Sequence, residues 1–216
     1  MRQLAIVRGM GDMDREIQLA EDRLRELDPI LGQIIIMQGP LRHAPRDDYF
    51  SALCQSIISQ QVSTAAAAAI FLRLKETTNL RPASVNLLNP TQIKFIGLSR
   101  QKASYLIDLA EHFVSNPKIY NHLSQSSDME VIAELTAVKG IGVWTAQMFL
   151  MFTLVRLDVF APADLGLQKA MAQLYGLKKP PSLKKLVSLS RKWQPYRTVA
   201  CWHLWRLLDA PSSAWE

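Results

Sequence analysis

The chain has 216 residues, of which 49% are apolar and 20% are charged. These are the proportions of a globular protein, so they exclude a disordered, collagen-like or low-complexity chain, and the length suits one domain or two fused subdomains. The 25 Lys and Arg against 19 Asp and Glu leave a net charge of +6, which favours a polyanionic partner without establishing one.

The spacing of apolar residues predicts helices along the whole chain. The first is an amphipathic helix opened by Asp14, and Asp28-Pro29 then starts a second helix that ends near Gly39-Pro40. Further helices are expected to begin, in chain order, at Tyr49 (ending at Ser59), Ser63 (ending near Lys75), Ser99, Asp128 and Ser182. Residues 79–90 and 177–181 hold Pro, Asn and Ser and are predicted to be short connectors. Because no segment has the alternation of a strand, we expect an all-α fold.

The cysteines and the apolar runs bear on the cellular compartment. Cys54 and Cys201 are too few for a disulfide framework or a four-thiolate metal site, so we expect two buried thiols in a reducing environment. The apolar run at residues 4–7 is too short for a signal peptide, and the run at 148–155 is too short to span a membrane. The sequence therefore predicts a soluble cytoplasmic protein.

Acidic and basic residues are segregated along the chain. Seven acids lie between Asp12 and Asp28, whereas residues 165–208 contain nine Lys and Arg and no acid. A second acid-free stretch, residues 77–107, carries four Lys and Arg. This distribution predicts a cationic surface that follows nucleic-acid phosphates; the alternative is two solvated faces of an ordinary basic protein.

Residues 135–146, LTAVKGIGVWTA, predict a helix–hairpin–helix. Gly140 and Gly142 are expected to adopt backbone dihedrals that other residues avoid, so that the chain reverses within a few residues. The following helix would then begin with unpaired backbone N–H groups, which bind an anion such as a phosphate. Lys139 and Thr145 would add a charge and a hydroxyl donor. The alternative is a plain tight turn without a ligand.

This segment is followed by LDVFAPADLGLQKAM, and the chain also contains SIISQQVSTAAA, IGLSRQKASYLIDLA and WQPYRTVACWHLW. Together these segments resemble the helix–hairpin–helix (HhH-GPD) DNA glycosylase superfamily, most closely its 3-methyladenine DNA glycosylase II group. The resemblance covers the chain from about Asp28 onward. The N-terminal β-rich domain that some members carry is not expected in this chain. It implies two helical subdomains with a DNA-reading cleft between them: residues 12–45 with 160–210, and residues 46–157 with the hairpin 135–146.

The resemblance implies a catalytic carboxylate at Asp164, which would stabilise an oxocarbenium-like transition state and orient the attacking water. The alternative role of Asp164 is helix capping. Asp158 is the other candidate for the catalytic carboxylate, but it is expected to have a structural role. Members with lyase activity carry Lys where this chain has Trp144, so no Schiff base is expected. The implied reaction is monofunctional hydrolysis that releases alkylated purines of the 3-methyladenine and 7-methylguanine type.

The resemblance also implies where the DNA is contacted. Gln61 would be the wedge that fills the gap left by the flipped base, with Gln60 supporting its loop, and His203 is expected to be structural. The expected base pocket consists of Trp144, Trp205, Met148 and Tyr49, with Met148 replacing the Tyr of some members. Backbone carbonyls that could hold a sodium or potassium ion are those of Thr136, Val138 and Ile141.

No catalytic metal and no other cofactor is expected. The expected partner is double-stranded DNA containing damaged bases. The protein is expected to bind it as a monomer, in a nucleoid or a nucleus, and to have no membrane partner. Two alternatives remain open. One is a glycosylase for deaminated or other damaged bases, because Met148 alters the pocket. The other is a non-catalytic helix–hairpin–helix DNA-binding protein, which would bind DNA and release no base.

Overall fold

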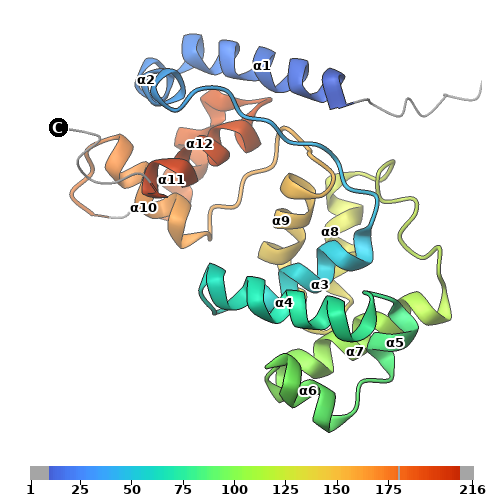
Figure 1. The fold of residues 1–216 in the computed structure, drawn as a ribbon. Coiled ribbons are helices and arrows are strands. Elements are labelled where there is room, and N and C mark those ends of the chain that lie inside the picture. Colours follow the sequence, from blue (N-terminus) through green and yellow to red (C-terminus); the bar gives the residue numbers. More distant parts are fainter. Residues whose placement is uncertain (1–9, 180, 210–216) are drawn as a thin grey trace, which may run out of the picture. The chain divides into compact units, whose positions relative to one another are not determined.

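The computed structural model describes residues 10–179 and 181–209, and within these residues the chain forms helices and no strand (Figure 1). The predicted all-α fold is confirmed. The chain divides into two compact units. We call the described residues of 10–45 and 155–209 the terminal unit and Arg46–Leu154 the central unit. Residues 155–157, which the resemblance placed in the central subdomain, lie in the terminal unit.

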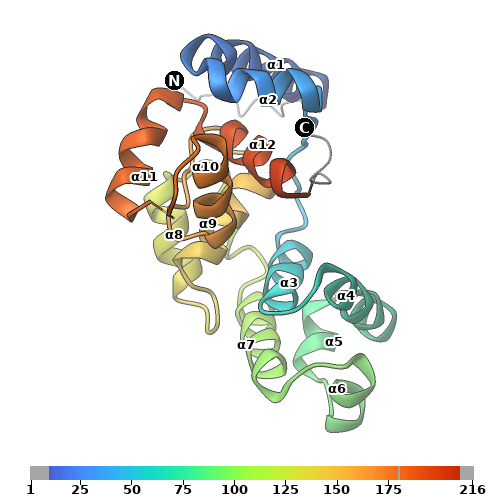
Figure 2. The same ribbon diagram turned by 90° about the vertical axis from the view of Figure 1, so that its left-hand side faces the viewer.

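The terminal unit places its first two helices against its last one. Its elements are α1 (Met10–Leu27), α2 (Pro29–Gln38), α10 (Leu165–Leu174), α11 (Leu183–Ser190), the 3-10 helix η1 (Arg191–Trp193) and α12 (Arg197–Asp209). Figures 1 and 2 both show α2 beside α1, and α12 packs against this pair. Helix α1 begins four residues before the predicted start at Asp14, because buried Met13 extends the apolar stripe that continues with Ile17.

The central unit is built around α3. Its elements are α3 (Tyr49–Ser59), α4 (Thr64–Thr78), α5 (Pro82–Asn86), α6 (Pro90–Ile96), α7 (Arg100–Ser115), α8 (Asp128–Thr136) and α9 (Val143–Phe152). Helix α3 packs against α4, α7 and α9, and its Leu53, Ile57 and Ile58 are fully buried. The predicted bounds of α3 are confirmed, whereas α4 ends at Thr78 rather than near Lys75.

The prediction of a connector over residues 79–90 is wrong, because this stretch holds α5 and the start of α6. Pro82 and Pro90 lie at the first positions of these helices, where the missing N–H of proline costs nothing. Asn89 caps α6 and forms a capping box with Gln92. These prolines thus begin helices rather than interrupt them.

Asp28 joins three segments of the terminal unit. Its Oδ1 accepts a hydrogen bond from the N–H of Leu31 at 3.4 Å, as an N-cap of α2. Its Oδ2 accepts from the Tyr175 hydroxyl at 2.5 Å and from Trp193 Nε1 at 2.8 Å, and lies 2.9 Å from Lys192 Nζ. Burial by itself raises the pKa of Asp28, but the hydrogen bonds from Tyr175, Trp193 and Lys192 outweigh it and lower this pKa below 3.8.

We expect Asp28→Asn to lower the free energy of unfolding by about 2–4 kcal/mol at neutral pH, because three donors lose a buried ionised acceptor. Since the pKa of Asp28 is lower in the folded than in the unfolded state, its stabilisation is complete above the unfolded value. It is lost as pH falls through the folded-state value. Urea denaturation from neutral to acidic pH should therefore show the difference between wild type and variant shrinking towards acid.

The exposed Asp12, in the same unit, supplies the control variant Asp12→Asn, which should leave stability nearly unchanged. A destabilisation by Asp28→Asn that stays constant down to acidic pH would contradict the assigned role of the ionised carboxylate.

Candidate active site

Asp164 lies at the N-terminus of α10 and is its N-cap residue. Its Oδ1 accepts the N–H of Leu167 at 2.7 Å and the indole Nε1–H of Trp205 at 2.9 Å. The N–H of Asp164 itself donates to the carbonyl of Ala161 at 3.0 Å. Two helices, α10 and α12, therefore fix the position of this carboxylate. Both of the roles considered from the sequence, capping and carboxylate chemistry, are open to the same side chain.

Gly166 allows the close approach of Asp164 and Trp205. A Cβ at this position would lie 3.0 Å from Asp164 Oδ1 and 3.2 Å from Trp205 Nε1. These separations are shorter than ordinary van der Waals contact, so a side chain here would displace the indole or the carboxylate. A glycine two residues after the carboxylate is thus part of the site, although it was not among the site residues predicted from the sequence.

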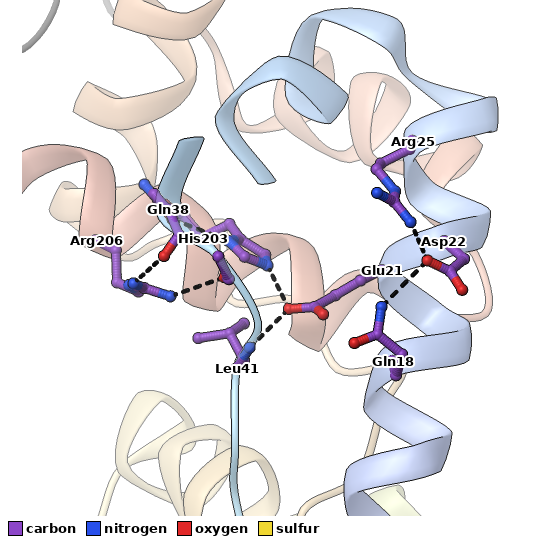
Figure 3. Close-up of polar contacts among 9 residues, drawn as sticks. Gln18, Glu21, Asp22, Arg25, Gln38, Leu41, His203 and Arg206 are labelled. Carbon is purple, nitrogen blue, oxygen red and sulfur yellow. Dashed lines mark hydrogen bonds and ion pairs between the residues drawn. The ribbon is translucent and has the colours of Figure 1, made fainter. Parts of the chain in front are cut away.

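The turn of α12 that precedes Trp205 is anchored by a buried polar network, drawn in Figure 3. His203 is completely buried, with Nε2 2.9 Å from Glu21 Oε1 and Nδ1 2.8 Å from Gln38 Oε1. Glu21 Oε1 also accepts the N–H of Leu41 at 2.8 Å. Since buried polar groups are stabilised only when they are hydrogen-bonded, this geometry agrees with the expected structural role of His203.

Arg206 completes the attachment of α12 to the end of α2. Its Nη2 donates to the carbonyl of Gln38 at 2.6 Å, and its Nη1 donates to the carbonyl of Gly39 at 3.3 Å (Figure 3). These contacts satisfy carbonyls at the C-terminus of α2, where a cation is also favoured by the helix dipole. Trp205 is therefore carried by a helix segment that is held on both sides of it.

Asp158, the competing carboxylate, forms an ion pair with Arg197. Arg197 Nε lies 2.7 Å from Oδ1 and Nη2 lies 2.9 Å from Oδ2, and the backbone N–H of Arg197 donates to Oδ1 at 3.3 Å. This two-point contact joins the segment before α10 to the start of α12. The geometry agrees with the structural role expected for Asp158.

The hairpin between α8 and α9 belongs to the central unit. Gly140 has a φ of 84°, in the left-handed region, and buried Ile141 donates its N–H to the carbonyl of Val138 at 3.1 Å. Gly142 caps α9 with a φ of −98°, a conformation that any residue adopts. The expectation that both glycines supply dihedrals that other residues avoid is therefore wrong for Gly142 and holds for Gly140.

No side-chain hydrogen bond caps the N-terminus of α9 among the residues that the structure describes. Gly142 and Lys139 are exposed, whereas the side chain of Thr145 is only 4% exposed. Thr145 Oγ1 lies 3.5 Å from Gln60 Nε2. The Thr145 hydroxyl is therefore buried rather than exposed as a donor for a phosphate, whereas Gly142 at the start of α9 is exposed.

Gln60 and Gln61 form the turn between α3 and α4. Gln60 Nε2 donates to the carbonyl of Gly140 at 3.0 Å, so its side chain supports the hairpin loop, in agreement with the role expected from the sequence. Gln61 is exposed and has a φ of 55°, a left-handed conformation that is uncommon for a residue with a side chain. Strained backbone of this kind clusters at functional sites.

The expected pocket residues are distributed over both units. Trp144 and Met148 lie one turn apart on α9, Trp144 being 42% exposed and Met148 half-buried. Tyr49, at the start of α3, makes an edge contact with Phe149, with ring centroids 5.3 Å apart. These residues belong to the central unit, whereas Trp205 belongs to the terminal unit with Asp164.

Other expectations concern thiols, metals and membranes. Cys54 and Cys201 are confirmed as buried free thiols, and burial raises the pKa of both. Residues 10–179 and 181–209 contain no group of three or more His, Cys, Asp or Glu side chains arranged to hold a metal ion. In the same residues no helix is both long and apolar enough to cross a membrane.

Residues 54–195 match the family described as "HhH-GPD superfamily base excision DNA repair protein". Because the match covers more than half of the chain, the chain belongs to this family, which confirms the resemblance noted in the sequence. DNA-3-methyladenine glycosylase 1 of Schizosaccharomyces pombe is 31% identical over 195 residues, which cover 87% of this chain and 86% of that protein.

A second relative and a solved structure agree. The DNA-3-methyladenine glycosylase of Saccharomyces cerevisiae is 33% identical over 207 residues, covering 78% of this chain and 69% of that protein. The solved structure of the S. pombe 3-methyladenine DNA glycosylase in complex with abasic DNA superposes with a TM-score of 0.81 at 29% identity. That superposition covers 89% of this chain and 97% of the other.

Proposed function

We propose that the protein is a monofunctional DNA glycosylase that releases alkylated purines of the 3-methyladenine and 7-methylguanine type. The observation that carries the proposal is the carboxylate of Asp164, held at the start of α10 by the N–H of Leu167 and the indole of Trp205. It occurs in a member of a base excision repair family whose relatives are named DNA-3-methyladenine glycosylases.

The proposed reaction breaks the bond between the sugar C1′ and the base nitrogen. An alkylated purine already carries a positive charge, so it leaves with the bonding electrons and needs no further proton. The sugar becomes oxocarbenium-like, and the negative charge of Asp164 stabilises it at the point where positive charge develops. Water then adds to C1′, and Asp164 orients it and accepts its proton. Trp144 occupies the position at which members with lyase activity carry a lysine, so no amine at that position opens the sugar and the product is an intact abasic site.

In this proposal the extruded base is held by aromatic and apolar faces. Trp144, Trp205 and Tyr49 offer rings that attract a cationic purine by stacking and cation–π interaction. Met148 offers a flexible thioether that adapts to the shape of the base. The exposed position of Trp144 on α9 supports its assignment to ligand contact rather than to the core.

The proposed partner is double-stranded DNA with damaged bases. The backbone amides of Gly140, of Gly142 and of the first turn of α9 would bind a phosphate, and Lys139 would add a positive charge. The lack of a side-chain cap on α9 supports this part of the proposal. The carbonyls of Thr136, Val138 and Ile141 would hold a monovalent cation beside that phosphate. Gln61 would fill the gap in the base stack. Such a protein acts on genomic DNA, in a nucleoid or a nucleus.

We expect the protein to release free 3-methyladenine and 7-methylguanine from methylated DNA, with undiminished activity in EDTA because no step uses a divalent metal. Mass spectrometry of the released bases measures this directly. The DNA should remain uncut until alkali is added, because the product is an abasic site. Release of uracil or hypoxanthine alone would favour the deaminated-base reading suggested by Met148. Tight, salt-sensitive DNA binding without release of any base would favour a non-catalytic DNA-binding protein.

A further inference from the structure

One face of α7 reaches two separate loops of the central unit. Lys102, Tyr105 and Asp108 are spaced three residues apart and therefore lie along one side of this helix. Lys102 contacts the turn after α3, which carries Gln61, and the other two contact the hairpin turn. We call residues 60–63 the wedge turn and residues 139–142 the hairpin turn.

Lys102 forms hydrogen bonds to the end of α3 and to the wedge turn. Its Nζ donates to the carbonyls of Ile58 and Gln60, each at 2.6 Å. These carbonyls lie at the C-terminus of α3, where main-chain acceptors have no partner within the helix and a cation is favoured. Burial lowers the pKa of Lys102 from its ordinary value of 10.5. The ammonium thus holds the peptide group immediately before Gln61, whose left-handed backbone persists only where the surrounding structure supports it.

Gln60 extends this support to the hairpin turn. While its carbonyl accepts from Lys102, its side-chain Nε2 donates to the carbonyl of Gly140 at 3.0 Å. The two residues are 80 positions apart in the chain. A single residue therefore connects the end of α3 with the turn between α8 and α9.

Tyr105 and Asp108 hold the hairpin turn to the same helix. A Cβ on Gly140 would lie 2.2 Å from Tyr105 Cδ2, so the ring lies directly against the backbone of this glycine. Asp108 Oδ2 accepts the N–H of Lys139 at 3.0 Å. Helix α7 thereby sets the separation between the hairpin turn and the wedge turn.

We propose that Lys102, acting with Gln60, is a positioning residue that locks the wedge turn to the hairpin turn, so that Gln61 enters the duplex in register with the phosphate contact. This inference rests on the proposed glycosylase function. A duplex is stiff, and the wedge must replace one nucleotide while the hairpin binds one phosphate group. A displacement of about 1 Å between two such contacts can cost on the order of a hundredfold in rate.

The test uses the full chain and a single alkylated purine in two duplexes, one fully paired and one with an abasic site opposite the lesion. In the second duplex no partner base remains for the wedge to hold apart. We expect Lys102→Met to lower the single-turnover rate of base release about tenfold on the paired duplex and about threefold or less on the other. Affinity for undamaged duplex should change little, because the hairpin still binds phosphate.

Two variants provide the controls. Lys102→Arg keeps a cation that can reach both carbonyls and should recover most of the rate on the paired duplex. Lys118→Met removes an exposed lysine of the same unit and should leave both rates unchanged. If Lys102→Met does not fold, as judged by urea denaturation, Gln60→Leu removes the bridge to Gly140 without changing Lys102, and the same pattern is expected of it.

A double-mutant cycle with Gln61→Ala separates positioning from general stability. Because Lys102 acts through Gln61, adding Lys102→Met to Gln61→Ala should cost less than a further twofold on the paired duplex. Equal losses on both duplexes, or independent losses in the cycle, would overturn the positioning role while leaving the glycosylase intact. A wild-type protein that releases no base from either duplex would instead overturn the proposed function, and this inference with it.

Discussion

Asp164→Asn is expected to lower the single-turnover rate of base release by about 10²–10⁴-fold, with little change in affinity for DNA. The substitution removes the negative charge that stabilises the oxocarbenium-like sugar and the basicity that accepts a proton from water. It keeps an amide oxygen in the place of Oδ1, which accepts from the N–H of Leu167 and from Trp205 Nε1. The cap of α10 and the position of the indole should therefore survive, and the variant should fold.

The measurement is base release at saturating enzyme, together with DNA affinity and urea denaturation of the same preparation. Asp158→Asn is the matched control, because this carboxylate pairs with Arg197 in the same unit. Asp158→Asn should reduce stability. At a temperature where both variants are folded, its rate of base release should stay within about threefold of the wild-type rate. An Asp164→Asn variant as active as the wild type would remove Asp164 from the chemistry and leave it the role of a cap.

The helices were predictable wherever a local pattern determines them. The apolar stripe that predicts α1 lies within the helix itself, at Ile17 and Leu24. The residues that predict the starts of α4 and α7, Ser63 and Ser99, directly precede these helices. The error at residues 79–90 came from treating Pro82 and Pro90 as interruptions, although the pairing of Asn89 with Gln92 was readable as a helix start. The capping box is a local signal, and it outweighs the Pro, Asn and Ser content of the segment.

The site was predictable in a different way. Asp164 followed from segments that resemble a family and the hairpin from its own glycine pattern, whereas the contacts that hold them follow from packing. Trp205 meets Asp164 across 41 residues, and Lys102 meets Gln60 across 42. No periodicity or cap encodes such contacts, because they depend on how whole helices pack together. The same holds for the ring of Tyr105, which explains Gly140 more fully than the turn does.

Of the glycine-to-alanine substitutions in the hairpin turn, we expect Gly140→Ala to reduce stability and DNA affinity the most. The new Cβ would lie 2.2 Å from Tyr105 Cδ2 and 2.3 Å from its Cγ, so the ring or the turn must move. The φ of 84° adds the cost of a left-handed residue. Together these effects predict a loss of about 2–4 kcal/mol in the free energy of unfolding, and at least a tenfold loss of affinity for DNA.

Gly142→Ala is the matched control, two residues away in the same turn. No atom lies within 4 Å of the Cβ it would add, and the backbone is already in an extended conformation open to any residue. Stability should therefore change by less than about 0.5 kcal/mol. Urea denaturation and DNA titration of both variants, side by side, distinguish a steric requirement at one glycine from a general intolerance of the hairpin.

The two costs at Gly140 can be separated with a second substitution. In a Tyr105→Ala background the ring is absent, so adding Gly140→Ala should cost only the backbone term, about 1 kcal/mol. If Gly140→Ala costs as much without the ring as with it, the close approach of α7 does not determine the glycine, and the backbone conformation alone does. If the penalty falls as expected, the hairpin turn owes its position to α7, the helix that also carries Lys102 to the wedge turn.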